Sequence, residues 1–350
     1  MLAAVVGSGL IALSVYSIVT GLPLGRLNLL KPGADGPSAD VIHRDFPDAA
    51  LPPGLGHDGQ QYYAVARQPM HLDQAARSLD RPRYRLQRIA FPALVWALHP
   101  AGGGDGLLWA TFAVGVAAIV AGTYATGALS VRLGGSPWLG LVFTMAPATM
   151  LTLLLSLADS LALAAVIAAV VAYLSRRPGL ALVPAVIGVL AKESLLLILI
   201  GFALGRRDRE SIRLAVVPGL AAAAWWVALR FLVEDHSAGV IEFTYPFGGL
   251  IESLPGWLDG NFPIAFGSVV LTLAFGVLVL ARVGLRHPLG WAIAIQLAFI
   301  PFLGPDVLGL DANGTRMTTP LLVLAAVARA TPRAGRSPAP SSPTAQTAAA

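Results

Sequence analysis

Cysteine is absent from this chain of 350 residues, and charged residues are scarce. Without a thiol the chain can form neither a disulfide framework nor a thiolate metal site, and a cysteine nucleophile is excluded. Charged residues make up 12% of the sequence and hydrophobic residues 56%, whereas soluble domains carry about 25% charged residues. The composition therefore predicts an all-α integral membrane protein.

The sequence also lacks two features that would redirect this interpretation. No basic residue precedes the first apolar run, and no small-residue cleavage pattern follows it, so we interpret Met1 to Leu22 as a retained first helix and not as a signal peptide. The net charge of +5 comes from arginines in short connections between apolar runs. Such arginines orient a membrane protein, so nucleic-acid binding is not expected.

Nine apolar runs are candidates for membrane segments. They cover residues 2–22, 106–130, 138–156, 160–175, 179–204, 214–233, 263–282, 288–304 and 317–330. Arginine-rich connections are expected on the cytoplasmic side, and they include Arg132, Arg176, Arg206 to Arg213, Arg282 and Arg329. Acidic connections at Asp159, Asp259, Asp306 and Asp311 are expected outside.

The run 179–204 has arginines at both ends, so a single crossing would break the charge rule. Lys192 and Glu193 lie in its middle, the only adjacent charged pair inside an apolar run. We predict a hairpin of two short helices whose apex, Lys192-Glu193, faces outward; the alternative is one long span with a buried ion pair. With the hairpin counted twice, the chain has about ten membrane segments and both termini in the cytoplasm.

One transmembrane domain is predicted over residues 1–333, and two long extracytoplasmic loops belong to it. The first, 23–105, should carry short amphipathic helices, one from Gly59 to Arg67 with Asp58 as its cap. Another, Arg88 to Leu98, is too short to span and should lie along the interface. The second loop is 234–262. The tail 334–350, rich in Pro, Ser, Thr and Ala, is predicted to be disordered and cytoplasmic.

Polar chemistry concentrates between Gly56 and Trp96, just after the first apolar run. This stretch is either a functional site or a solvated loop at the membrane surface. The segment His57-Asp58-Gly59-Gln60-Gln61-Tyr62-Tyr63, followed by Tyr84-Arg85-Leu86-Gln87-Arg88 and then Phe91-Pro92, resembles bacterial multi-pass membrane proteins related to the GT-C class of glycosyltransferases. The resemblance covers about the first hundred residues well and the remainder only in pattern.

The resemblance implies a hexosyl- or pentosyltransferase of the cell envelope. GT-C enzymes take sugars from polyprenyl-phosphate carriers, and an acidic residue in the first extracytoplasmic loop is their catalytic or metal-binding carboxylate. Asp58 matches that position and could hold Mg²⁺ or Mn²⁺; the alternative is a plain Asp-Gly turn. Asp40, His43, Asp45 and Asp48 form a second acidic group whose spacing fits no defined metal motif.

Cationic side chains could steady the phosphate that leaves in such a transfer. We expect this of Arg83, Arg85 and Arg88, although arginines also anchor loops at lipid headgroups. Lys192 and Glu193 lie where ionisable groups are costly and usually functional. Lys192 could contact the phosphate, with Glu193 as a second catalytic acid; a purely structural pair is the alternative. The relatives carry an Arg similarly placed to Arg316.

The remaining residues of the first motif are candidates for substrate binding: His57, Gln60, Tyr62 and Tyr63. His57 departs from better-known relatives, which have an aromatic residue before the acidic one, and no unmistakable second catalytic carboxylate is present. Three functions therefore stay open. They are a transferase acting on an extracytoplasmic glycan or lipid acceptor, a non-catalytic membrane component of an envelope assembly, and a lipid or solute transporter.

Overall fold

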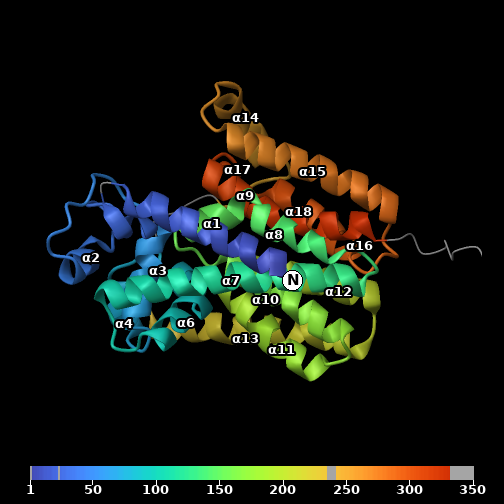
Figure 1. Cartoon of the computed structure of the whole chain (residues 1–350), viewed down its shortest axis with the longest axis horizontal. Coiled ribbons are helices and arrows are strands. Elements are labelled where there is room, and N and C mark those ends of the chain that lie inside the picture. Colours follow the sequence, from blue (N-terminus) through green and yellow to red (C-terminus); the bar gives the residue numbers. More distant parts are fainter. Residues whose placement is uncertain (1, 23, 235–241, 332–350) are drawn as a thin grey trace, which may run out of the picture.

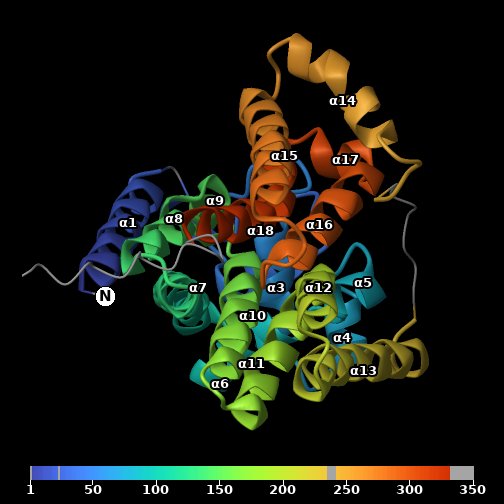
Figure 2. The same cartoon turned by 90° about the vertical axis from the view of Figure 1, so that its right-hand side faces the viewer.

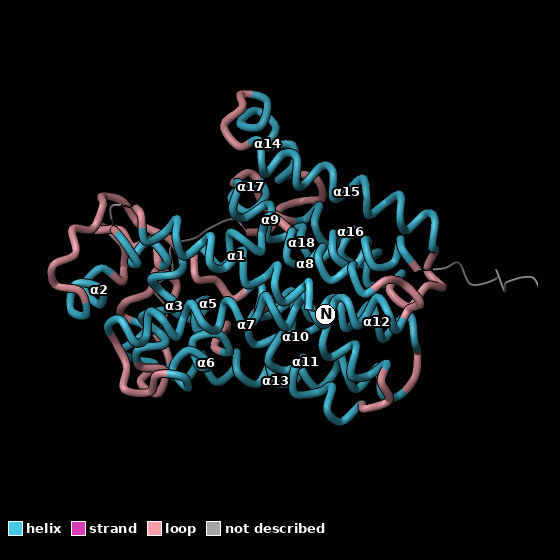
Figure 3. Tube along the Cα trace, in the orientation of Figure 1, coloured by secondary structure: helices cyan, strands magenta, loops and turns pink. Residues whose placement is uncertain are grey.

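The structure is a computed structural model that describes residues 2–22, 24–234 and 242–331. Helices and the turns between them make up these residues, and no strand is present among them (Figures 1 and 3). One isolated antiparallel bridge joins Phe243 to Leu303. The predicted all-α class is confirmed, whereas the predicted disordered tail lies outside the described residues.

The helices follow one another with few long connections (Figure 2). The α-helices are α1 (Leu2–Thr20), α2 (Ala39–Asp45), α3 (Asp58–Arg67), α4 (Leu72–Ala76), α5 (Pro82–Leu86), α6 (Ala90–Leu98), α7 (Gly104–Arg132), α8 (Gly140–Met145), α9 (Pro147–Leu154), α10 (Asp159–Leu174), α11 (Pro178–Ala191), α12 (Leu196–Arg206), α13 (Arg209–Leu232), α14 (Gly248–Leu258), α15 (Pro263–Val283), α16 (Gly290–Phe299), α17 (Pro305–Leu308) and α18 (Asp311–Ala330). Short 3₁₀ turns cover Gly25–Leu29, Pro137–Leu139, Glu193–Leu195 and Ile300–Phe302.

Three helices are long and apolar enough to cross a membrane: α7 with 29 residues, α13 with 24 and α15 with 21. The pair α8 and α9 would add a fourth if the two form one bent span. The helices α10, α11 and α16 are apolar but shorter. Each predicted apolar run therefore contains helix, but length and composition alone support fewer crossings than the ten segments expected from the sequence.

The run 138–156 is not the single straight segment that its composition predicts. It breaks between Met145 and Pro147, and the two pieces meet at an angle of 53°. Ala146 has an extended backbone (φ −62°, ψ 128°) because the ring of a following proline disfavours the helical conformation at the residue before it. The Thr149 hydroxyl donates to the carbonyl of Phe143 at 2.6 Å and so satisfies a backbone group that the break frees.

The predicted break in the run 179–204 is present. Lys192 is extended (φ −158°, ψ 109°) between α11 and the 3₁₀ turn that leads into α12. Its ammonium binds Asp159 at the start of α10, while Asp208, just after α12, accepts a hydrogen bond from Tyr173 near the end of α10. Helix α11 therefore runs antiparallel to α10 and reaches the start of α10 at Lys192. Helix α12 returns toward the end of α10, as predicted for a hairpin.

The arginine-bearing turns lie at the same end of the molecule. Gly135, after α7, packs against the backbone of Ala330 at the end of α18. His287, in the turn between α15 and α16, is 2.8 Å from the hydroxyl of Thr331. The segment from α2 to α6 lies at the opposite end, on the left of Figure 1. The sequence prediction that these basic turns share one side agrees with this arrangement.

The packing of α12 on α16 depends on Gly201. A Cβ there would lie 2.6 Å from the backbone nitrogen of Ala292, and backbone cannot move aside as a flexible side chain can. We expect Gly201→Ala to destabilise the fold by about 1–3 kcal/mol, the usual cost of overpacking. Gly219→Ala is the matched control, because its Cβ would meet only side-chain atoms of Leu196, the nearest at 3.4 Å.

Denaturant unfolding in detergent would measure both variants. Gly219→Ala should be neutral or slightly stabilising because alanine favours the helix over glycine. Equal stability of the two variants would mean that α12 and α16 do not pack as closely as the structure has them.

Candidate functional site

Helix α3 lies within the fold of the first loop and not on its surface. Residues Gly59 to Ala66 are all buried, so the helix that the sequence predicts is present but is surrounded by other segments of the fold. A side chain at Gly59 would overlap the carbonyl of Leu155. Because glycine has no side chain, the start of α3 can approach the turn between α9 and α10. Asp58, the first residue of α3, is thereby placed beside helices that come from distant parts of the sequence.

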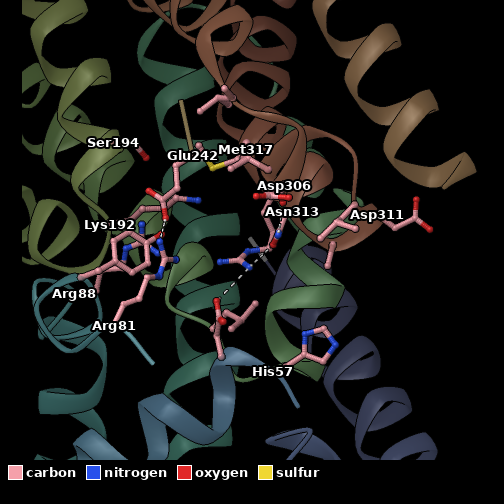
Figure 4. Close-up of a pocket in the computed structure, with 18 of the residues that line it drawn as sticks. His57, Arg81, Arg88, Lys192, Ser194, Glu242, Asp306, Asp311, Asn313 and Met317 are labelled. Carbon is pink, nitrogen blue, oxygen red and sulfur yellow. Dashed lines mark hydrogen bonds and ion pairs between the residues drawn. The ribbon is translucent and has the colours of Figure 1, made fainter. Parts of the chain in front are cut away.

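A cavity of about 570 Å³ opens where the first loop, the Lys192 break and the start of α18 meet. Figure 4 shows Arg81, Arg88 and Lys192 on one side of it, with Asp306, Asn313 and Asp311 on the other. Of the residues predicted to form a site, the cavity brings together His57, Asp58, Arg85, Arg88, Lys192, Glu193 and Arg316. Apolar side chains complete the wall: Leu157, Phe243, Phe262, Phe299, Leu303, Val307, Leu310 and Met317.

Asp58 binds arginines and does not cap its helix. Its Oδ1 lies 2.9 Å from Nη1 of Arg85 and its Oδ2 lies 3.9 Å from Nη1 of Arg316. The residue at the cap position is His57, and no side chain caps α3. Burial raises the pKa of Asp58, but the charges of Arg85 and Arg316 more than offset it, so the net pKa is below the ordinary value.

Asp159 is the residue that sequence reasoning missed. It was interpreted only as a mark of a loop, yet its side chain is 11% exposed and binds both Lys192 and Arg316. Nη2 of Arg316 lies 2.9 Å from Oδ2 of Asp159. One signal was available: a single carboxylate between two apolar runs is costly unless it is paired.

Three arginines surround Tyr84, which the cavity also exposes. The guanidinium carbons of Arg81, Arg88 and Arg85 lie 4.0, 4.4 and 5.4 Å from the centre of its ring. Positions 81, 84, 85 and 88 share one face at helical spacing, and a cation within about 6 Å of an aromatic ring is attracted to it. Arg81 and Tyr84 were not among the predicted site residues.

The arginines also connect separate segments of the chain. Arg81 donates to Glu242, which precedes α14, at 2.7 Å. Arg88 donates through Nε and Nη2 to both oxygens of Glu193, at 3.0 and 2.7 Å. Both oxygens of Glu193 thus accept hydrogen bonds from Arg88, and the acid role that the sequence suggested for Glu193 stays a prediction.

Four predicted site residues do not line the cavity. Gln60 donates to the carbonyl of Leu55 at 2.5 Å and shapes the preceding turn. Tyr62 is buried against Phe91. The Tyr63 hydroxyl donates to Asp45 at 2.7 Å, and Arg83 donates to the carbonyl of Val233 at 2.9 Å, which attaches the loop to the end of α13. These contacts indicate structural roles.

The surroundings of Asp58 do not fit a divalent cation. Its nearest charged partners are guanidinium groups, whereas Mg²⁺ and Mn²⁺ are bound by several oxygen ligands. Among the described residues, no three His, Asp or Glu side chains gather in a way that could hold a metal. The second acidic group is likewise divided, since Asp45 binds Arg67 at 2.9 Å. We therefore assign no step to a metal.

Asp80 provides a pH test of the arginine pairs. Burial raises the pKa of Asp80, but the hydrogen bond from Arg85 and the charge of Arg85 lower the pKa by more, so that it falls to about 2. A carboxyl group whose pKa is lower in the folded state stabilises the fold above its unfolded pKa, about 3.9, and loses that contribution as the pH falls toward the folded value. We expect stability to be level from neutral pH to about 5 and to decline below about 4.

Thermal unfolding in detergent between pH 2 and 8 would measure this decline for the wild type and for Asp80→Asn. The variant should lose less stability than the wild type between pH 4 and 2, because it has one fewer carboxylate to protonate. A variant that declines as steeply as the wild type would show that the Arg85–Asp80 pair contributes nothing.

No protein-family model, curated protein or solved structure matches the chain.

Proposed function

We propose that the protein is an integral membrane glycosyltransferase that transfers a sugar from a polyprenyl-phosphate donor to a glycan or lipid acceptor outside the cytoplasm. One observation carries the proposal: Asp58, the carboxylate that the GT-C resemblance points to, lies in the same cavity as Arg85, Arg88 and Arg316. These residues come from the first loop and from α18, so their meeting is not a consequence of sequence proximity.

The composition of the cavity wall supports a ligand with a charged head and an apolar tail. Arg81, Arg88 and Lys192 occupy one side, and guanidinium forks match phosphate oxygens. Phe243, Phe262 and Phe299 belong to the apolar part of the wall. A polyprenyl phosphate combines these two requirements in one molecule, with the phosphate toward the arginines and the isoprenoid chain toward the phenylalanines.

In the reaction, an acceptor hydroxyl forms a bond to the anomeric carbon of the sugar while the bond from that carbon to the phosphate oxygen breaks. The phosphate leaves with the bonding electron pair, and the hydroxyl proton passes to Asp58. A lowered pKa makes the Asp58 carboxylate a weaker base. A donor phosphate that engages Arg85 or Arg316 would offset the charges that lower the pKa of Asp58, and the bound donor thus makes Asp58 a better base.

The proposal includes a position in the plasma (inner) membrane. About ten segments would lie in the bilayer, with both termini and the arginine-bearing turns in the cytoplasm and the cavity on the outer side. The three long apolar helices and the gathering of basic turns at one end support this orientation. The return of the chain at Lys192 allows α11 and α12 to count as two short segments.

A non-catalytic role in an envelope assembly is the second candidate, and one observation favours it. Each basic side chain that lines the cavity already has a carboxylate partner, as expected of a purely structural network. A transporter is less well supported, because the buried charges form one group at a single end of the helices and not a series along a path.

The test is a turnover assay on purified protein in nanodiscs, with a panel of polyprenyl-phosphate sugars, with and without Mg²⁺ or Mn²⁺. Release of free sugar or of polyprenyl phosphate by the wild type, with none from empty nanodiscs, would support the transferase. Binding of donors without any release would favour the non-catalytic role. If no donor binds, the proposal is wrong.

A further inference from the structure

Every arginine and lysine that lines the cavity forms an ion pair with a carboxylate. Arg81 pairs with Glu242, Arg85 with Asp58, Arg88 with Glu193, and Lys192 and Arg316 both pair with Asp159. An anionic group that enters must therefore take a cation away from a carboxylate. The exchange costs least where the displaced carboxylate can remain hydrated, because an unpaired buried charge is expensive.

The exposed fractions of the carboxylate side chains indicate which ion pair can exchange its carboxylate for an anionic ligand. The side chain of Glu193 is 42% exposed, whereas that of Asp159 is 11% exposed. Glu193 also lies in a 3₁₀ turn of three residues, where its side chain faces the cavity. Glu193 can therefore release Arg88 and stay in contact with water, while Asp159 cannot leave its partners without an uncompensated charge in the interior.

Arg88 would not lose its position when Glu193 leaves. Its guanidinium carbon stays 4.4 Å from the centre of the Tyr84 ring, and that of Arg81 lies 4.0 Å from the same centre. The ring contact does not use the N–H groups, so they remain available to an incoming oxygen acceptor. Tyr84 thus contacts both guanidinium groups, and this contact does not depend on the carboxylates.

We propose that Arg81 and Arg88, held against the ring of Tyr84, form a subsite for the phosphate of a polyprenyl-phosphate sugar, a phosphodiester, and for the phosphate monoester that remains when the sugar has left. Glu193 is the carboxylate that this phosphate replaces on Arg88. The proposal rests on the proposed function, since it names the groups that bind the donor's phosphate. Tyr84 is a positioning residue in it, and Glu193 is an internal competitor of the ligand. The assignment of Glu193 differs from the acid role that the sequence suggested for it.

The first experiment measures binding of farnesyl phosphate to the full-length protein in phosphatidylcholine nanodiscs. Glu193→Gln should bind the probe about tenfold more tightly than the wild type, because the competing charge is gone; this factor corresponds to about 1.4 kcal/mol. Glu210→Gln is the matched control, since Glu210 also pairs with an arginine, Arg213, but at the opposite end of the molecule. It should leave the affinity unchanged.

The second experiment separates the ring of Tyr84 from its hydroxyl. Tyr84→Phe should bind farnesyl phosphate within about twofold of the wild type, and Tyr84→Leu should bind about tenfold more weakly, within the range of cation–π energies. Rescue by phenylalanine distinguishes positioning of the arginines from a hydroxyl contact with the ligand. Loss of binding in both variants would assign the effect to the hydroxyl and overturn the role of the ring.

Two further probes identify the source of the phosphate. Farnesol lacks the charge and should not respond to Glu193→Gln. Inorganic phosphate lacks the chain, and equal gains for it and for farnesyl phosphate would assign the subsite to free phosphate. An unchanged or weakened affinity of Glu193→Gln for farnesyl phosphate would overturn the proposal even if the wild type transfers sugar. Tighter binding in that variant, together with no turnover of any donor by the wild type, would support the subsite and leave the transferase function wrong.

Discussion

Asp159→Ala is expected to be among the most destabilising single substitutions in the protein. Asp159 is the shared partner of Lys192 and Arg316, whose side chains are 6% and 9% exposed. Its removal leaves two buried cations beside each other without their carboxylate. Breaking a buried ion pair by removing one partner costs about 3–5 kcal/mol, and the repulsion between the two remaining cations adds to that cost.

One carboxylate is shared by two cations in this network, so the removal of one cation provides the control. In Lys192→Met, Asp159 keeps Arg316 and no charge is left unpaired, so we expect a smaller loss of unfolding free energy than in Asp159→Ala. Asp105→Asn removes a carboxylate from the pair with Arg26, in which both side chains are about half exposed, and should cost no more than about 1 kcal/mol. Denaturant unfolding in detergent would rank the three variants. Equal losses in all three would contradict the network.

Asp58→Asn is expected to abolish most turnover while the protein remains folded. Asparagine keeps the shape of the side chain but cannot take the acceptor proton, and general base catalysis contributes about 10²–10⁴-fold in rate. The fold should tolerate the change, because Arg85 retains Asp80 at 2.8 Å and Arg316 retains Asp159 at 2.9 Å. The loss should appear in kcat and not in KM for the donor.

Asp80→Asn is the matched variant for this measurement. It removes one carboxylate from the same arginine, Arg85, but Asp80 does not line the cavity. Turnover of a polyprenyl-phosphate sugar should fall less than tenfold in Asp80→Asn, and by at least a hundredfold in Asp58→Asn, the lower end of the range for a general base. Similar rates in the two variants would remove Asp58 from the proton transfer.

Several features of the fold could be predicted because they depend on local chemistry. Apolar runs with arginines at their ends predicted the helices and the clustering of basic turns. The arginines at both ends of the run 179–204 and the charged step at Lys192-Glu193 predicted the break, since a straight span would leave the two basic ends on opposite sides of the membrane. Pro147 could have predicted the bend at Ala146, because a proline disfavours the helical conformation at the residue before it. The average hydropathy of the run 138–156 does not show this local effect.

Part of the predicted site comes together in one cavity for a similar reason. Ionisable residues inside apolar runs are costly unless they have partners or a function, and this identified Lys192 and Glu193. The GT-C resemblance pointed to Asp58 and Arg316, and all four line the cavity. Asp159 was passed over because its surroundings in the sequence resemble an ordinary turn. Gln60 and Tyr63 were included only because they lie near Asp58 along the chain, yet on α3 they face the interior of the loop.

Composition and periodicity were sufficient to establish a helical protein of strongly apolar character, with its ionisable groups concentrated after the first helix. They could not establish which charges meet. Asp159, Lys192 and Arg316 are far apart in the chain, and their pairing follows from the way α10, the Lys192 break and α18 converge. Charge pairing depends on distances of a few ångströms, and only the packing of the helices sets those distances.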